Sequence, residues 1–193
     1  AMAELAARAG VPAGVINVVA GSARVIGGEL TSNPIVRKLT FTGSTPIGKI
    51  LQAQCAETMK KTSMELGGNA PFIVFDDADI DAAVDGALIS KYRNAGQTCV
   101  APDYVLCPAD RVQAFVDEFR ARFAEMYPSL RDNDDYTAII NERQYNRLQG
   151  YLEDARAKGA ELVEINPANE NMKDGTRKIP LTLVLKTTPD MKV

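Results

Sequence analysis

The feature that most constrains the fold is the alternation of short β-branched runs with longer segments of helical periodicity. The run VRKLTF, 36–41, passes directly into FTGSTPIGK, 41–49, and helix-forming residues continue to about Met59. The segments KKTSMEL and PFIVF predict the next two strands. A strand-helix-strand-helix series is typical of doubly wound α/β folds with a mostly parallel sheet, so we expect an α/β chain.

The segment before this series predicts a helix, a buried strand and a second helix. Residues 1–10, AMAELAARAG, favour a helix that ends at Gly10, because glycine is common just past helix C-termini. The run GVINVVAG, 14–21, is apolar, β-branched and bounded by glycines, which is typical of a strand buried on both faces of a parallel sheet. Ser22 resembles an N-cap for a helix that continues to Leu30.

The rest of the chain predicts further helices and strands. The acidic turn DDADID, 76–81, is typical of a helix start, and apolar residues at helical spacing from Ile80 predict a helix that ends close to Arg93. Valines and phenylalanines from Val112 to Phe123 predict a second amphipathic helix. The remaining elements are a helix at about 142–158, strands at DYVLC, ELVEI and LTLVLK, and a polar loop at 166–178.

Composition argues against two classes of partner. The net charge is -3 and the pI is near 5.1, and the lysines and arginines are scattered, so the chain has no basic patch for nucleic acid. No run approaches the roughly 20 uncharged apolar residues that a membrane-spanning helix needs. We therefore expect a small-molecule or protein partner, with neither nucleic acid nor a membrane.

Cysteine and histidine content limits the chemistry. The three cysteines, Cys55, Cys99 and Cys107, are widely spaced, which argues against a disulfide framework and favours a reducing, cytoplasmic location. The chain has no histidine, so we expect no zinc site or other metal. Cys-His and Ser-His dyads are also excluded, and any catalytic base must be a carboxylate, a lysine, a tyrosine or water.

Two glycine-rich stretches contain candidate site residues. In FTGSTPIGK, Gly43 and Ser44 lie where a strand turns into a helix, whose free amides and dipole can receive a phosphate group. A simple turn with a helix cap is the alternative. In MELGGNAPF, Glu65 stands just before Gly67 and Gly68, which allow close backbone approach to a ligand. The alternative for Glu65 is a solvated glutamate at a strand end.

The stretch NAGQTCVAPDY places Cys99 among small and turn-forming residues. The thiolate is the reactive form of cysteine, and oriented backbone amides, a helix terminus or a nearby cation lower the pKa of a thiol. Gly96 and Gln97 leave the backbone free to turn amides toward the group that the sulfur attacks, as part of an oxyanion hole. An inert loop thiol is the alternative, and Cys107 is expected to pack as a small apolar residue.

At their mutual spacing, the stretches FTGSTPIGK, ELGGNAPFIV and NAGQTC resemble the aldehyde dehydrogenase superfamily, with Cys99 34 residues after Glu65. The resemblance covers nearly the whole chain and implies a three-layer αβα fold with NAD or NADP as cofactor. It implies that Cys99 attacks the aldehyde carbon and forms a thioester. It also implies that Glu65 activates the hydrolytic water, which a carboxylate can do where desolvation raises its pKa.

The resemblance implies binding residues as well. Two residues of the cysteine motif, Asn94 and Gln97, are expected to shape its loop rather than to transfer protons. Four residues match positions that lie near the dinucleotide in the family: Gly43 and Ser44 at the phosphate turn, and Leu66 and Gly67 beside the nicotinamide.

The two parts of the chain resemble different subclasses of this superfamily. Residues 1 to about 100 are most similar to succinate-semialdehyde dehydrogenases, in which an arginine six positions before the nucleophile binds the substrate carboxylate. Arg93 holds that place, and a guanidinium suits such a charge, although a surface arginine at a helix end is the alternative. After Cys99, VAPDYVLC and DYTAIINERQYNRL resemble class 3 and coniferyl-type aldehyde dehydrogenases. We expect succinate semialdehyde as substrate, with an aromatic or long-chain aldehyde as the alternative.

The resemblance also implies a chain truncated at both ends. Residues 1–65 correspond to the last part of the NAD(P)-binding domain, and residues 66–193 to an incomplete catalytic domain. We expect such a segment to be inactive alone and to form a homo-oligomer through exposed strand edges. Two other classes stay open: a non-catalytic module with the same fold, and a thiol esterase or acyl transferase that uses the same cysteine without nicotinamide.

Overall fold

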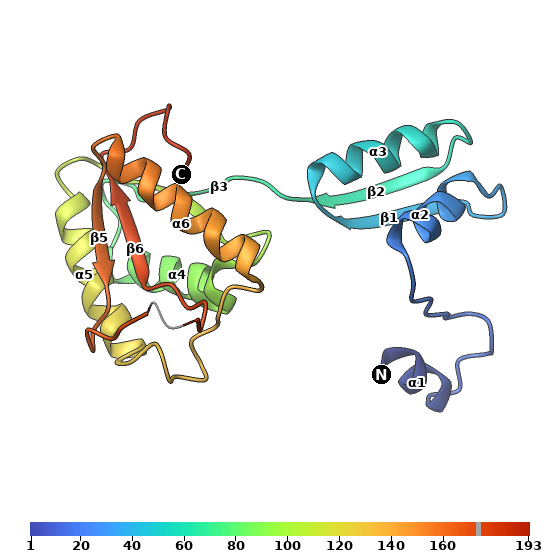
Figure 1. Ribbon diagram of the computed structural model, residues 1–193, viewed down its shortest axis with the longest axis horizontal. Helices are drawn as coiled ribbons and strands as arrows, with labels where there is room; N and C mark the ends of the chain where they lie inside the picture. Colours follow the sequence, from blue (N-terminus) through green and yellow to red (C-terminus); the bar gives the residue numbers. More distant parts are fainter. Residues whose placement is uncertain (173–174) are drawn as a thin grey trace. The chain divides into compact units, whose positions relative to one another are not determined.

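The chain forms two compact units, Ala1–Gly67 and Gly68–Val193. The computed structural model describes residues 1–172 and 175–193, and Figure 1 shows their helices and strands. Residues 173 and 174, which belong to the polar loop expected at 166–178, lie outside the described residues. In the described part of the chain, no helix combines the length and the apolar content needed to traverse a bilayer.

The first unit is built around a parallel strand-helix-strand motif. Strand β1 (Lys38–Gly43) pairs in parallel with β2 (Lys61–Leu66), and helix α3 (Thr45–Ala56) connects them, as the sequence predicts (Figure 1). Gly48 lets α3 lie close to β2, because a Cβ added at this position would stand 2.6 Å from Cδ2 of Leu66. Because β1 and β2 are parallel, their carboxyl ends lie at the same edge of the pair.

Two helices precede this motif. Helix α1 (Met2–Arg8) and helix α2 (Ala23–Ser32) form where the sequence predicts them. Ser22 occupies the N-cap position of α2, but its side chain makes no capping hydrogen bond. The residue after α2 is held by Lys60, a buried lysine whose Nζ donates a hydrogen bond to the carbonyl oxygen of Asn33 at 2.7 Å. This bond ties the end of α2 to the start of β2.

The strand expected at 14–21 does not form, so this prediction was wrong. The large apolar side chains of the segment are between 52% and 75% exposed: Val15, Ile16, Val18 and Val19. A strand buried on both faces needs neighbours, whereas the sheet of this unit consists of β1 and β2 alone among the described residues. The sequence pattern correctly marked an apolar segment, but a strand there would need a pairing partner, which the described residues do not supply.

The second unit begins with another parallel strand-helix-strand motif. Strand β3 (Ala70–Ile73) pairs in parallel with β4 (Pro102–Leu106). Helix α4 (Ile80–Tyr92) lies between them in the chain and is followed by the one-turn segment η1 (Arg93–Gly96). The predicted acidic cap is confirmed, because the Asp79 carboxylate accepts a hydrogen bond from the first turn of α4 at 3.1 Å.

Two helices and an antiparallel strand pair complete the second unit. Strand β5 (Glu161–Ile165) pairs with β6 (Leu181–Leu185), and both α5 (Val112–Met126) and α6 (Glu142–Ala157) contact β5 (Figure 1). All four elements lie where the sequence predicts them. Over residues 1–172 and 175–193, the chain is thus a mixed α/β segment with three two-stranded sheets, of which two are parallel.

The core of the second unit lies between α4, α5 and the β5–β6 pair. Its central members are large apolar side chains with little exposure: Val84, Leu88, Phe115, Phe119, Phe123, Leu130, Ile165 and Leu181. Tyr92, the last residue of α4, packs edge to face on the ring of Phe123, with 5.0 Å between ring centroids. Tyr136 stacks on Tyr92 at 6.2 Å and donates a hydrogen bond to the carbonyl oxygen of Ile179 at 2.6 Å. The end of α4 is therefore fixed by aromatic packing.

This aromatic core predicts alkaline instability. Burial, reinforced by the neighbouring tyrosines, raises the pKa of Tyr92 and Tyr136 above the ordinary tyrosine value near 10. Above that value the unfolded chain releases these protons and the folded chain keeps them, so the free energy of unfolding falls with rising pH. Each tyrosine contributes a slope of about 1.4 kcal/mol per pH unit.

Urea unfolding followed by circular dichroism, between about pH 8 and about pH 11, measures this slope. Tyr92→Phe removes one titrating group, and we expect the slope above pH 10 to fall accordingly. Tyr104 lies on β4 and is 46% exposed, so Tyr104→Phe is the matched control and should keep the wild-type slope. An unchanged slope in Tyr92→Phe would contradict the assignment.

Candidate functional site

Four predicted site residues lie at the carboxyl edge of the β1–β2 pair. Gly43, the last residue of β1, is the register partner of Leu66, the last residue of β2. Glu65 is exposed on β2 opposite Thr42. Gly67 directly follows β2 and is exposed as well. Parallel α/β sheets bind ligands at this edge, so the first unit presents a carboxylate beside the expected dinucleotide contacts.

Ser44 starts α3 directly beyond the same edge. It is the exposed N-cap residue of this helix, and its side chain makes no capping hydrogen bond. In the first turn, Pro46 has no amide hydrogen, whereas the amides of Thr45 and Ile47 have no carbonyl of the helix to bond. A phosphate group can accept hydrogen bonds from such amides and from a hydroxyl. The residues present therefore fit the phosphates of NAD or NADP.

Cys99 lies at the exposed tip of a turn in the second unit. The amide of Ala101 donates a hydrogen bond to the carbonyl oxygen of Thr98 at 3.2 Å, which closes a turn with Cys99 and Val100 at its centre. Cys99 has a free, exposed thiol. Ala101 is only 3% exposed, so the turn is anchored on its C-terminal side while the thiol stays accessible.

The backbone before Cys99 contains three consecutive left-handed residues. Their φ angles are +63° at Asn94, +51° at Ala95 and +75° at Gly96. Glycine adopts this region freely, but alanine pays about 1 to 2 kcal/mol for it. A Cβ added at Gly96 would also stand 3.0 Å from Cε of Lys91. Non-glycine residues in this conformation persist only where their surroundings hold them, so the loop needs ties to the rest of the unit.

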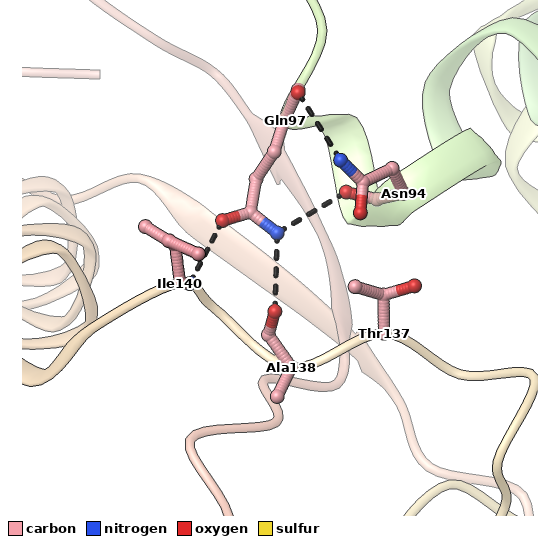
Figure 2. A pocket seen from close by; sticks show the side chains of 5 residues that line it. All are labelled: Asn94, Gln97, Thr137, Ala138 and Ile140. Carbon is pink, nitrogen blue, oxygen red and sulfur yellow. Dashed lines mark hydrogen bonds between the residues drawn. The ribbon is translucent and has the colours of Figure 1, made fainter. Parts of the chain in front are cut away.

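Gln97 supplies one set of ties, to residues 138–140 (Figure 2). Its Nε2 donates hydrogen bonds to the carbonyl oxygens of Ala138 at 3.1 Å and Asn94 at 3.2 Å, and its Oε1 accepts one from the amide of Ile140 at 2.9 Å. The Nδ2 of Asn94 donates to the carbonyl oxygen of Gln97 at 3.3 Å. A pocket of about 360 Å³ lies beside these bonds and is lined by Asn94, Gln97, Thr137, Ala138 and Ile140.

Lys91 and Asp103 form a second connection near the loop. The Nζ of Lys91 lies 4.0 Å from Oδ1 of Asp103, and both side chains are partly exposed. The Oδ2 of Asp103 accepts a hydrogen bond at 2.8 Å from the amide of Ala70, where the register of β3 and β4 shifts. Burial lowers the pKa of Lys91, and the Asp103 carboxylate opposes this effect. The pair links the start of β3 to the side chain that packs on Gly96.

The structure therefore gathers the predicted residues into two groups. Arg93 is exposed at the start of η1, on the same loop as Cys99. The first unit carries the other predicted residues at one edge: Gly43, Ser44, Glu65, Leu66 and Gly67. That both groups belong to one site stays a prediction. In the described residues, no cluster of three or more His, Cys, Asp or Glu side chains could hold a metal ion.

Sequence reasoning missed two parts of the loop's surroundings. Residues 138–140 contact Gln97 through backbone groups, which leave no pattern in the side chains. Asp103 follows a proline at the start of a strand, and this position carried no chemical motif of its own. No signal in the sequence indicated these contacts, because the partial burial of the Gln97 amide, which requires hydrogen-bond partners, is known only from the structure.

Comparisons with known proteins give a consistent result. The model of the "Aldehyde dehydrogenase family" matches residues 1–193. The chain is 55% identical over 165 residues to a glutarate-semialdehyde dehydrogenase from Pseudomonas aeruginosa, which covers 84% of this chain and 34% of that protein. It is 51% identical over 172 residues to the NADP(+) succinate-semialdehyde dehydrogenase from Escherichia coli, which covers 88% of this chain and 36% of that protein.

A solved structure is similar over almost the whole chain. The crystal structure of succinate-semialdehyde dehydrogenase from Burkholderia pseudomallei matches with a TM-score of 0.87 and 45% identity, covering 99% of this chain and 39% of that one. The chain spans about a third of the length of the curated relatives that it matches.

Proposed function

Because this chain belongs to the aldehyde dehydrogenase family, we propose that it provides the nucleophile, the general base and part of the cofactor site for oxidation of an aldehyde to a carboxylic acid with NAD or NADP. The activity is proposed for a full-length protein in which these residues stand with the rest of the family fold, since the chain spans 34% to 36% of its relatives. The 193-residue chain alone is expected to be inactive. The observation that carries the proposal is the exposed Cys99 thiol on a hydrogen-bonded turn.

Cys99 is the proposed nucleophile. Its sulfur attacks the carbonyl carbon of the aldehyde, and the carbonyl oxygen becomes an oxyanion that the backbone amide of Cys99 helps to hold. Oxidised NAD or NADP, held in the full-length protein by the residues described below, would supply the hydride acceptor for this oxidation, and Cys99 would keep the acyl group as a thioester. The exposed turn supports this role because an aldehyde can reach the sulfur there.

Glu65 is the proposed general base for the second half of the reaction. Its carboxylate takes a proton from water while the water oxygen attacks the thioester carbon, which releases the acid and frees the Cys99 sulfur. Its exposed position at the carboxyl edge of β2, two residues before Gly67, supports this role. The flanking glycines allow the backbone conformations that a moving carboxylate needs.

The proposed cofactor-binding residues also lie at the carboxyl edge of the β1–β2 pair. Gly43 and Ser44 would hold the dinucleotide phosphate through the first turn of α3, and Leu66 and Gly67 would lie beside the nicotinamide. Their common position at the carboxyl edge of a parallel strand pair supports this assignment.

The proposed architecture follows the family. We assign residues 1–65 to the NAD(P)-binding domain and residues 66–193 to the catalytic domain of a three-layer αβα fold with a mostly parallel sheet. The two parallel strand-helix-strand motifs support this arrangement. A homo-oligomer in a reducing, cytoplasmic compartment is proposed as well, supported by strand pairs whose outer edges can accept a neighbour and by three free cysteines.

The proposed substrate is a semialdehyde that carries a carboxylate, with succinate semialdehyde first. Two relatives named for such substrates support it. The proposed carboxylate ligand is Arg93, which is exposed on the Cys99 loop. In the full-length protein, Arg93→Met should raise KM for succinate and glutarate semialdehyde by about 10- to 100-fold, because a charge-assisted hydrogen bond is lost. The KM for butanal, which has no carboxylate, should stay unchanged.

Steady-state rates of NADH or NADPH formation with these aldehydes and an aromatic aldehyde measure the effect. Arg143→Met removes an exposed arginine on α6 and is the matched control. An equal effect of Arg93→Met on butanal would contradict carboxylate recognition. A preference of the wild-type protein for the aromatic aldehyde would favour the coniferyl-type alternative.

A further inference from the structure

We infer that Gln97 is a positioning residue for Cys99 and that residues 138–140, held on their other edge by Arg177, form the support on which it acts. The inference rests on the proposed role of Cys99 as nucleophile. It adds a part to the site that lies more than 35 residues further along the chain and that contributes no side chain to the chemistry.

The side-chain amide of Gln97 occupies the place of a neighbouring strand. It bonds the carbonyl oxygen of Ala138 at 3.1 Å and the amide of Ile140 at 2.9 Å, two groups that flank Ile139 (Figure 2). In an extended segment, such groups of residues i and i+2 point to the same side, where a strand partner would bond them. Both polar atoms of the Gln97 amide are therefore used on this one edge.

The opposite edge of the segment is bonded to Arg177. The amide of Ile139 donates to the carbonyl oxygen of Arg177 at 3.0 Å, and the Nε of Arg177 donates back to the carbonyl oxygen of Ile139 at 3.0 Å. Ile139 is only 5% exposed. The segment thus has hydrogen bonds on both edges and a side chain buried at its centre.

The support continues into the core. The hydroxyl of Tyr136 donates to the carbonyl oxygen of Ile179 at 2.6 Å, and the Nζ of Lys178 donates to that of Asn133 at 2.7 Å. Tyr136 is a buried member of the hydrophobic core. Residues 133–140 are therefore fixed to residues 177–179, and Gln97 attaches the Cys99 loop to this fixed surface.

The loop needs this attachment because its own backbone is unfavourable. Three left-handed residues, 94–96, directly precede Gln97, and Cys99 follows it by two residues at an exposed tip. Loss of the Gln97 bonds would let the backbone relax and displace the sulfur. A misplacement of about 1 Å can lower the rate of a reaction by about 100-fold while binding is retained.

Two variants of Gln97 separate this role from simple packing. Gln97→Met keeps the length of the side chain and removes all three bonds, whereas Gln97→Glu keeps an acceptor for Ile140 and loses the donor for Ala138 and Asn94. Gln113→Met removes an exposed glutamine on α5, whose side chain donates a hydrogen bond to Asp117 in the same helix, and is the control.

The first measurement is amide hydrogen exchange in the 193-residue chain, with thermal unfolding as the check on folding. Exchange at Ile140 should accelerate by about tenfold or more in Gln97→Met and stay near the wild-type rate in Gln97→Glu. The second measurement is steady-state kinetics of the full-length protein. Both Gln97 variants should lower kcat by about 10- to 100-fold with KM within about twofold of wild type. Gln113→Met should change neither quantity.

Each part of the inference has its own refuting result. Unchanged exchange at Ile140 in Gln97→Met would show that residues 138–140 do not depend on Gln97. Faster exchange with an unchanged kcat would show that Gln97 does not position Cys99. If Gln97→Met does not fold, Gln97→Glu decides alone: its kcat must fall while Ile140 stays protected. Failure of the proposed function is distinguishable, because it appears as oxidation by a Cys99→Ala protein, whereas the exchange result does not depend on activity.

Discussion

Replacement of Cys99 by alanine in the full-length protein should lower aldehyde oxidation by about 10⁴-fold or more, because the covalent adduct can no longer form. Formation of NADH or NADPH from succinate semialdehyde measures the loss, and circular dichroism checks that the exposed turn tolerates the change.

Cys107→Ala is the matched control for this experiment. Cys107 follows β4 and is partly buried, and burial raises the pKa of its thiol, which disfavours the reactive thiolate. We expect its replacement to leave turnover near the wild-type rate. Ordinary turnover in Cys99→Ala would refute the assignment. Turnover in neither the wild type nor the variants would favour a non-catalytic module, and thioester hydrolysis without NADH or NADPH formation would favour an esterase or acyl transferase.

Replacement of Glu65 by glutamine should lower steady-state turnover by about 10² to 10⁴-fold, which is the range for loss of a general base. The change affects only hydrolysis of the thioester. The first turnover should therefore still form about one equivalent of NADH or NADPH per site, followed by a stalled acyl protein. Rapid mixing with absorbance detection resolves the burst, and mass spectrometry detects the acyl group on Cys99.

The control for Glu65 is an exposed glutamate of the same unit that is not part of the carboxyl ends of β1 and β2. Glu57, which directly follows α3, meets this description, and Glu57→Gln should show full turnover. Loss of the burst in Glu65→Gln would assign Glu65 to a step before hydride transfer. Full turnover in Glu65→Gln would remove it from the mechanism.

Elements with a strong local pattern could be predicted from the sequence. The β1–α3–β2 motif, α4 and α5 carry their own periodicity, and the Asp79 cap marks the start of α4. The run at 14–21 shows the limit of this reasoning. Its β-branched composition fits a strand, but a strand exists only where a neighbour offers backbone partners, and no local pattern reports that neighbour.

The candidate site also has a part that the sequence could predict and a part that it could not. Residue types identified Glu65 and Cys99, because a carboxylate beside glycines and a thiol in a polar loop carry recognisable chemistry. The left-handed backbone at Ala95 could not be predicted, since alanine does not favour that conformation. The bonds from Gln97 to residues 138–140 could not be predicted either, because two backbone groups far along the chain have no signature in the sequence.

The uncovered run at 15–20, VINVVA, has a consequence for the handling of the protein. It is a six-residue window with β-branched side chains, no charge and no proline, and its valines and isoleucine are exposed. Windows of this composition are the ones that stack into cross-β filaments when they meet copies of themselves. We therefore expect fibril growth from this run in concentrated solutions of the 193-residue chain, and a lysine in place of Val18 should slow it by adding a charge to the window.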